Sequence, residues 1–293
     1  MNREDQKVAL AVKKAIPHIA RAVDLAVKAL TNGGRLIYIG AGTSGRLGVL
    51  DAAECRPTFG SEQVLAVIAG GPKAMLKAGE GAEDDRASAR RDLQSIGLSK
   101  KDVLVGLTAS GQTPYTLEGL RYAKQLGAGT VGVTANPAAA MRGVPNIKIV
   151  TAVGPEIVAG SSRLKAGTAE KLVLNMLSTA TMVRLGRVLS GWMINVQLTN
   201  NKLRARGCSI LMKATAVDSR AARRALDASG NNLPAALLMI WKNASKDEAM
   251  RLLNEEPNIA GVLRRAQQEY NRRSSPARAS NHRRRRNISR RSS

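Results

Sequence analysis

Short apolar runs alternate with helical patterns along the first half of the chain. Five runs are rich in Val and Ile: RLIYIG (35–40), QVLAVIAG (63–70), DVLVGLTA (102–109), GTVGVTA (129–135) and IKIVTAV (147–153). Segments with helical spacing, such as 84–97 and 114–127, lie between them. Apolar strands that alternate with helices are typical of a parallel sheet buried on both faces. We therefore expect an α/β fold in which ligands bind beyond the carboxyl ends of the strands.

Helices are also expected before the first strand and after the last strand of this sheet. A helical hairpin is predicted at about 6–30, and one long helix over 167–188. From residue 205 to 268 the pattern changes to short helices separated by Gly, Asn and Pro, at 219–230, 232–243 and 246–256. This change predicts a small C-terminal helical subdomain.

The positive charge is concentrated at the C-terminal end. The net charge is +24, and residues 270–293 hold nine arginines and no acid, so 24 − 9 leaves +15 for the remainder. Such a segment buries little apolar surface and is expected to be disordered. An arm that binds nucleic acid is the alternative, but Tyr270 is the one aromatic residue nearby and no folded recognition module accompanies it. We thus expect three parts: 1–204, 205–269 and the tail 270–293.

The composition narrows the class of protein. Two cysteines, Cys55 and Cys208, cannot form a disulfide framework, which favours a reducing compartment. The N-terminus has no signal-like apolar core and no apolar run is long enough to span a membrane, so we expect a cytoplasmic protein. No His, Cys or Asp cluster has metal-ligand spacing, so no metal site is expected.

The stretch GAGTSG follows the first predicted strand. Gly40, Gly42 and Gly45 match the dinucleotide fingerprint. A dinucleotide site also needs an acid at the end of the second strand, and QVLAVIAGG ends without one. No Gly-Lys-Ser/Thr follows, so the stretch is not a P-loop either.

Small hydroxyl residues gather in loops after three predicted strands. They and their neighbours are Thr43 and Ser44, then Ser110, Gly111, Gln112 and Thr113, then Ser161, Ser162 and Lys165. Hydroxyls at helix N-termini suit an anion, and each hydrogen bond to a charged phosphate is worth roughly 1.5–3 kcal/mol. The alternative is that Ser and Thr only cap helices. For three loops together we favour a phosphate monoester with sugar hydroxyls.

Four stretches carry a specific resemblance, from about residue 4 to about 268. GAGTSGRLGVLDAAEC, AGGPKAMLKAGEGAEDD, ASGQTPYTLEGLRYAKQLG and GPEIVAGSSRLKAGTAEKLVLNMLST resemble the N-acetylmuramic acid 6-phosphate etherases. That family has the sugar isomerase (SIS) fold, which implies a three-layer αβα sandwich with a five-stranded parallel sheet. The resemblance implies cytoplasmic recycling of cell-wall amino sugar. The D-lactyl ether is cleaved to N-acetylglucosamine 6-phosphate and D-lactate, without metal, nucleotide or other cofactor.

The resemblance also assigns two glutamates. Glu54, in DAAEC, corresponds to the family's acid and Glu83, in EGAEDD, to its base. The base removes the C2 proton of the open-chain sugar and the acid protonates the leaving lactate oxygen, each step being worth roughly 10²–10⁴-fold. If the helix ends before Pro57, Glu54 lies in its last turn, where the negative helix end disfavours an ionised carboxylate.

The reach of one helix raises a difficulty. Ser44 and Glu54 are separated by about 15 Å on a straight helix, longer than a hexose phosphate. We therefore expect a homodimer whose interface completes the site, or a helix break near Gly48. The chain also departs from the family: Arg56 is a cation beside Glu54, Gln112 stands where arginine is frequent, and a further N-terminal segment is missing.

Two other functions are compatible with this fold. One is a sugar-phosphate sensor similar to the glucokinase regulatory protein, which would bind without turnover. The other is a ketose–aldose isomerase, which the etherase-like runs around both glutamates disfavour. The presence of Glu54 and Glu83 favours the lyase.

Overall fold

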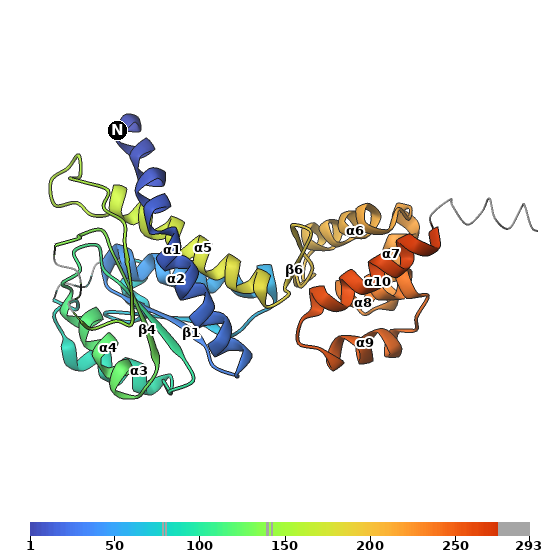
Figure 1. Cartoon of the computed structure of the whole chain (residues 1–293), viewed down its shortest axis with the longest axis horizontal. Helices are drawn as coiled ribbons and strands as arrows, with labels where there is room; N and C mark the ends of the chain where they lie inside the picture. Colours follow the sequence, from blue (N-terminus) through green and yellow to red (C-terminus); the bar gives the residue numbers. More distant parts are fainter. Residues whose placement is uncertain (78, 80, 139–140, 142, 275–293) are drawn as a thin grey trace, which may run out of the picture. The chain divides into compact units, whose positions relative to one another are not determined.

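The computed structural model describes residues 1–77, 79, 81–138, 141 and 143–274. The chain divides into two compact units, Met1–Leu185 and a second that begins at Gly186. The first unit contains the sheet and the second consists mainly of short helices (Figure 1).

The first unit is built on a five-stranded parallel sheet with the order β2-β1-β3-β4-β5. The strands are β1 (Leu36–Gly40), β2 (Val64–Ile68), β3 (Val103–Leu107), β4 (Gly129–Thr134) and β5 (Ile147–Val150). All five lie within the apolar runs that predicted them. In the central strands β1 and β3 every residue is buried, as expected for strands covered on both faces.

Helices cover both faces of the sheet and make three layers (Figure 1). They are α1 (Asn2–Thr31), α2 (Gly42–Phe59), α3 (Arg86–Ser95), α4 (Pro114–Gln125) and α5 (Lys165–Arg184), with a 3₁₀ turn η1 at Pro72–Met75. Because successive side chains of a strand point to opposite faces, Ile37 and Ile39 pack with α3 and α4. Tyr38 points the other way and donates a hydrogen bond to Asp51 of α2. The expected αβα sandwich is confirmed.

The prediction of an N-terminal hairpin was wrong, because α1 is one continuous helix from Asn2 to Thr31 with Pro17 inside it. The buried positions continue across Pro17 at helical spacing, among them Val8, Val12, Ile19 and Val23. This stripe packs along α5. The packing of a long apolar face therefore outweighs the hydrogen bond lost at one proline.

Helix α2 also differs from the prediction. It runs without a break from Gly42 to Phe59, through Gly48 and Pro57, and ends at Gly60 in the left-handed conformation (φ +61°). Hence the helix does not break near Gly48, and Glu54 is not in its last turn. The helix-end argument for Glu54 as an acid loses its basis.

The second unit contains the small hairpin β6 (Val188–Leu189) and β7 (Trp192–Met193), then α6 (Asn201–Thr215), α7 (Ser219–Ala228), α8 (Leu233–Lys242), α9 (Lys246–Glu255) and α10 (Ile259–Ser274). The side chains of Asn200, Asp218, Asn232 and Ser245 each accept a backbone N–H three residues on and so fix where α6 to α9 begin. Within the described residues, no helix is long and apolar enough to cross a membrane.

The division between the units falls at Leu185, before the expected boundary at residue 204. The reason is that Leu189, Ile194 and Leu198 belong to the same apolar core as Trp241 of α8. Residues 270–274, assigned to the tail from the sequence, are the last turn of α10. The arginine-rich remainder, 275–293, lies outside the described residues.

Candidate functional site

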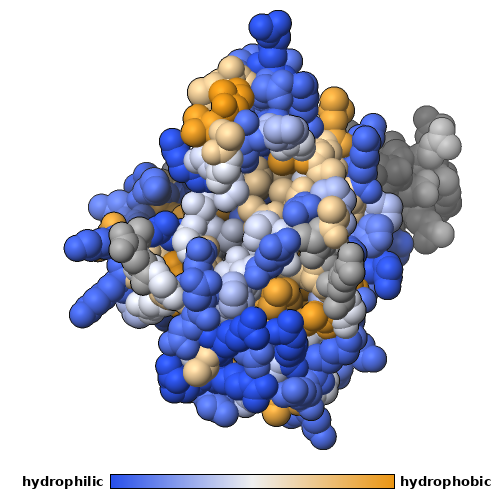
Figure 2. Space-filling view, turned by 90° about the vertical axis from the view of Figure 1, so that its left-hand side faces the viewer, coloured by the Kyte–Doolittle hydropathy of each residue, from blue (hydrophilic) through white to orange (hydrophobic). Residues whose placement is uncertain are grey.

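The loops that follow the strands meet at one edge of the sheet. All neighbouring strands are parallel, so their carboxyl ends lie at the same edge. In the chain, β1 is followed by β2 on one side of it and then by β3 on the other. The space between the ends of β1 and β3 is therefore a topological switch point, where ligands bind in such sheets. Figure 2 looks onto this edge and shows a hollow of intermediate hydropathy between hydrophilic side chains.

The glycines of GAGTSG have a packing role. Gly42 has φ +53°, a conformation that favours glycine. A Cβ added to Gly45 would lie 2.6 Å from the carbonyl oxygen of Gly40 and 2.7 Å from Cγ1 of Ile68. The first turn of α2 thus lies directly on the end of β1. This close approach accounts for the glycine pattern without a nucleotide.

Thr43 and Ser44 lie in that first turn, beside the start of α5. A Cβ on Gly167 of α5 would lie 3.4 Å from Cγ2 of Thr43. Ser44 is 8% exposed and its Oγ lies 2.9 Å from Oε1 of Glu170, at hydrogen-bond distance. Glu170 is 1% exposed, and burial raises its pKa to about 8, partly offset by the bond from Ser44. The sequence analysis did not identify Glu170 as a candidate, because a single acid in a helix is not distinguished by its sequence from a solvent-exposed one.

A cluster of hydroxyls follows β3. Thr108 Oγ1 lies 2.8 Å from Oγ1 of Thr113 and 3.2 Å from Oγ of Ser110. Thr108 also accepts the backbone N–H of Gly111, which has φ +72°. Gln112 is exposed at the turn. Thr108, the first residue after β3, contacts both other hydroxyls of this cluster, and the sequence did not single it out because it continues the run that predicts the strand.

The loop before α5 holds Ser161 and Ser162, half-buried and exposed respectively. The N-terminus of α5 is occupied, because the backbone N–H groups of Lys165 and Ala166 donate to the carboxylate of Glu156 at 3.0 and 2.9 Å. The Lys165 side chain is 2% exposed and its Nζ lies 2.7 Å from Oε2 of Glu4. Lys165 therefore ties α1 to α5. Its hydrogen bond, with one from Lys7, lowers the pKa of Glu4 to about 2.

Glu83 lies in the turn between β2 and α3. Its carbonyl oxygen accepts the backbone N–H of Tyr115 at 3.0 Å, which joins this turn to the start of α4. Glu83 lines a cavity of about 370 Å³ together with Gly42 and Arg46 of α2. The neighbouring Asp85 caps α3 through Ser88, and this backbone hydrogen bond lowers the pKa of Asp85. The structure thus gives the two acids different surroundings, with Asp85 capping α3 and Glu83 lining the cavity.

Glu54 lies apart from this cavity. It is exposed on α2, about 15 Å along the helix from Ser44 at about 1.5 Å per residue. Arg56, expected to act on Glu54, instead lies 3.1 Å from the carboxylate of Glu62. Within one chain, the structure therefore brings Glu83 to the first turn of α2 but leaves Glu54 more than two helical turns from it.

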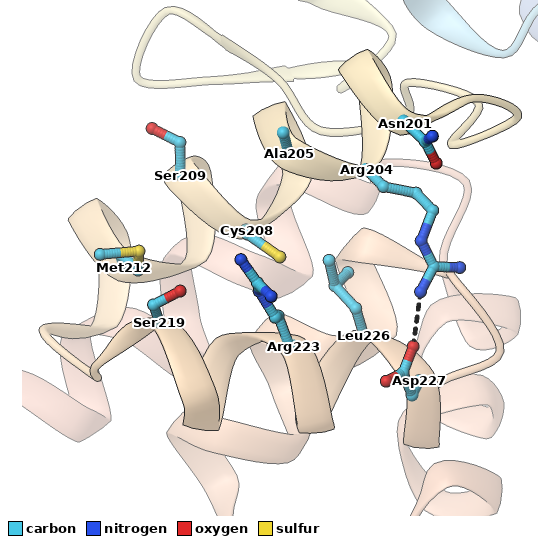
Figure 3. A pocket seen from close by; sticks show the side chains of 10 residues that line it. All are labelled: Asn201, Arg204, Ala205, Cys208, Ser209, Met212, Ser219, Arg223, Leu226 and Asp227. Atoms are coloured by element: carbon cyan, nitrogen blue, oxygen red, sulfur yellow. Dashed lines mark hydrogen bonds and ion pairs between the residues drawn. The ribbon is translucent and has the colours of Figure 1, made fainter.

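A separate cavity of about 490 Å³ lies between α6 and α7 of the second unit. Cys208 and Arg223 point into it, and at one end Arg204 pairs with Asp227 at 2.7 Å (Figure 3). In the same unit, Asn200 caps α6 and Arg206 contacts the Met193 sulfur. Among the described residues, no three His, Cys, Asp or Glu side chains are grouped as metal ligands.

Comparisons with known proteins identify the family and the fold of the chain. A family model described as the glucokinase regulatory protein N-terminal SIS domain matches residues 18–124. The chain is 51% identical over 268 residues to the N-acetylmuramic acid 6-phosphate etherase of Actinobacillus pleuropneumoniae serotype 7, covering 91% of this chain and 87% of the relative. It is 48% identical to the one from Geobacillus thermodenitrificans, covering 91% and 90%. A crystal structure of a putative phosphosugar isomerase from Bacteroides fragilis matches 66% of this chain and 93% of that one, with TM-score 0.50 and 20% identity, which shows the fold.

Proposed function

The chain belongs to the N-acetylmuramic acid 6-phosphate etherases, which are carbon–oxygen lyases, and on this premise we propose how its residues carry the reaction. The substrate is a phosphorylated amino sugar whose D-lactyl ether is cleaved. Lactate is eliminated and water is added with syn geometry, which yields N-acetylglucosamine 6-phosphate and D-lactate. The observation that carries the proposal is that Glu83 lines one cavity with the Gly42 turn, next to Ser44.

The phosphate and sugar hydroxyls bind at the switch point between β1 and β3. Thr43 and Ser44 come from one side, and Ser110 and Thr113 from the other, held in place by Thr108. The remaining ligands proposed from the sequence are Gly111, Gln112, Ser161, Ser162 and Lys165. Of these, Lys165 acts through its ion pair with Glu4, which supports the loop before α5.

The chemistry needs two proton-transfer groups. Glu83 removes the C2 proton of the open-chain aldehyde, and the electron pair forms the C2=C3 double bond. The C3–O bond breaks as Glu54 protonates the leaving lactate oxygen. Water then adds at C3 and the proton returns to C2, so that one water is consumed for each lactate released. Each positioned group is worth roughly 10²–10⁴-fold in rate.

Glu54 reaches the substrate from a second copy of the chain. The unbroken α2 supports this, because it holds Glu54 about 15 Å from Ser44 of the same chain. Leu50, one turn before Glu54 on the same helix face, is 44% exposed, and a dimer interface at Glu54 would cover it. The protein is thus proposed to be a homodimer with Glu54 at an isologous interface.

Lactate release from N-acetylmuramic acid 6-phosphate tests the assignment. Glu54→Gln and Glu83→Gln are each expected to lower kcat by at least about 10²-fold. Two exposed acids nearby, Glu62 and Asp84, supply matched controls, since Glu62→Gln and Asp84→Asn should retain activity. Tight binding of the sugar phosphate without lactate release from the unaltered chain would instead indicate a sensor.

Mixed dimers test the interface. When chains carrying Glu54→Gln and Glu83→Gln are co-expressed, about half of the dimers are mixed, and each mixed dimer has one site with both glutamates. The mixture should recover about a quarter of wild-type activity. If both glutamates acted within one chain, every site would lack one of them and no activity would return.

A further inference from the structure

The contact between Ser44 and Glu170 joins two buried side chains at the edge where the phosphate is proposed to bind. Ser44 is 8% exposed and Glu170 is 1% exposed. The Ser44 hydroxyl lies 2.9 Å from Oε1 of Glu170. Among the described residues, Oε2 of Glu170 has no hydrogen-bond partner. A buried carboxyl group with one unpartnered oxygen calls for an explanation.

Among the residues that the structure describes, no cation pairs with Glu170. The helices α1 and α2 and the strand β4 contact α5, and β4 carries no titratable side chain. Four charged groups that α1 and α2 bring toward α5 have partners of their own. They are Glu4 with Lys165, Asp24 with Arg184, Asp51 with Lys171, and Arg46 with two carbonyl oxygens of η1. The desolvation of the Glu170 carboxylate is therefore offset only by its hydrogen bond with Ser44. As a result, burial raises the pKa of Glu170 to about 8.

The direction of the Ser44–Glu170 hydrogen bond depends on where the proton is. A serine hydroxyl has one hydrogen to donate. If Glu170 is ionised, Ser44 must give that hydrogen to Oε1, and none is left for a ligand. If Glu170 is neutral with its proton on Oε1, the acid donates to Ser44 Oγ. The Ser44 hydroxyl hydrogen is then free to be donated to a ligand. Oε2 remains a buried acceptor without a partner, and an unpartnered acceptor costs less free energy than a buried O–H donor without a partner.

We propose that Glu170 is a positioning residue for the phosphate: as a neutral acid it donates its proton to Ser44, so that the Ser44 hydroxyl donates to the phosphate of the substrate. The inference rests on the proposed role of Ser44 as a phosphate ligand. It also removes a repulsion, because an ionised Glu170 would place a second negative charge beside the phosphate.

This role predicts how binding depends on pH. Above a pKa of about 8, Glu170 is ionised in the free protein, so binding of the phosphate requires Glu170 to take up a proton from solvent. Affinity for the product N-acetylglucosamine 6-phosphate should therefore fall above that value, by a factor that approaches tenfold per pH unit. The phosphate itself is already a dianion in this range.

Calorimetric titration with N-acetylglucosamine 6-phosphate from pH 6.5 to 9.5 tests the inference. Wild type should lose about fivefold in affinity between pH 8 and 9, and the loss should approach tenfold per pH unit above pH 9. Glu170→Gln, whose amide always donates to Ser44, should bind as wild type does at low pH and show no such loss. A matched control is Asp51→Asn, which removes a different buried carboxyl group. Asp51 lies on α2 and accepts hydrogen bonds from Tyr38 and Ser178, and the variant should keep the wild-type pH profile. Equal alkaline losses in wild type and Glu170→Gln, or none in wild type, would overturn the inference.

Two measurements separate its failure from that of the proposed function. If Ser44→Ala leaves affinity unchanged, Ser44 is not a phosphate ligand and the proposed site fails as well. If Ser44→Ala weakens binding but Glu170→Gln keeps the alkaline loss, only the role of Glu170 fails. Should Glu170→Gln not fold, titration of wild type at pH 9 in buffers of different ionisation enthalpy decides the matter. Uptake of close to one proton per site is expected, and no uptake would refute it.

Discussion

The stability of Glu170→Gln relative to wild type should increase with pH. Burial raises the pKa of Glu170 from 4.5 to about 8. Below pH 4.5 the group is protonated in both states, so its favourable contribution to folding is fully present. Between these values the unfolded chain loses the proton while the folded chain keeps it, so stability falls by about 1.36 kcal/mol per pH unit. The contribution is lost completely as pH rises through the folded-state pKa.

The size of the effect follows from that window. From pH 5.5 to 7.5 the free energy of unfolding of wild type should fall by about 2–3 kcal/mol because of Glu170 alone. Glutamine does not titrate, and other shifted groups such as Glu4 and Asp102 are common to both proteins. The difference between variant and wild type therefore isolates Glu170, and it should grow by about 2–3 kcal/mol in favour of the variant.

Urea unfolding at pH 5.5, 6.5 and 7.5 measures this difference. Both tryptophans, Trp192 and Trp241, lie in the second unit, so their fluorescence reports that unit while far-UV circular dichroism also follows the first. Glu62→Gln, at an acid 72% exposed, is the control and should show a difference independent of pH. A similarly constant difference for Glu170→Gln would refute the reasoning, because it would mean that Glu170 ionises normally in the folded chain.

Two substitutions and one chemical modification test the packing of the fold. Asp102→Ala should cost about 3 kcal/mol in urea unfolding, because it removes a buried carboxylate that accepts two hydrogen bonds from the Arg35 guanidinium. Arg35 then keeps only its bonds to the carbonyl oxygens of Ile96 and Gly97. Gly45→Ala should cost about 1–3 kcal/mol or more in the same assay, since its Cβ would lie 2.6 Å from a carbonyl oxygen. Alkylation at pH 8, read by mass spectrometry, should modify Cys208 and spare Cys55, because Cys55 is 2% exposed and burial raises its pKa to about 12.

Each of these has a control. Asp24→Asn removes a surface ion pair with Arg184 and should cost less than about 1 kcal/mol. In Gly79→Ala the new Cβ would be 3.6 Å from its nearest neighbour, so stability should hardly change. Cys208→Ser should abolish alkylation. Comparable losses for Asp24→Asn and Asp102→Ala, or labelling of Cys55 in the folded protein, would contradict the packing described above.

The sheet could be predicted from sequence because its strands are buried on both faces. In a central strand such as Leu36–Gly40 every residue is buried, so the apolar run is uninterrupted. A glycine-containing turn marks its end. The N-terminal helix was mispredicted because its local sequence signal disagrees with its long-range packing. Pro17 is a local signal against helix, whereas the stripe that includes Val12 and Ile19 gains its energy from α5, more than 140 positions later in the chain.

The hydroxyl loops illustrate what a strand-end pattern can and cannot provide. The sequence identified Ser44, Ser110 and Thr113 because parallel strands bring their following loops to one edge, a property of topology alone. It did not identify Thr108, whose hydroxyl lies within hydrogen-bond distance of two other hydroxyls of the cluster. Thr108 directly follows β3, and local pattern does not distinguish such a residue from one that packs in the core.

Glu170 shows why the electrostatics of the site required the fold. In the sequence it stands next to Lys171, and neighbouring acid and base on a helix suggest a solvated pair. Residues one apart, however, point in different directions. In the structure Lys171 turns toward Asp51 while Glu170 faces the first turn of α2, without a cation. Whether a carboxyl group is a surface charge or a neutral donor at a phosphate site thus depends on which face of α5 the rest of the unit covers, and that is decided by residues far away in the chain.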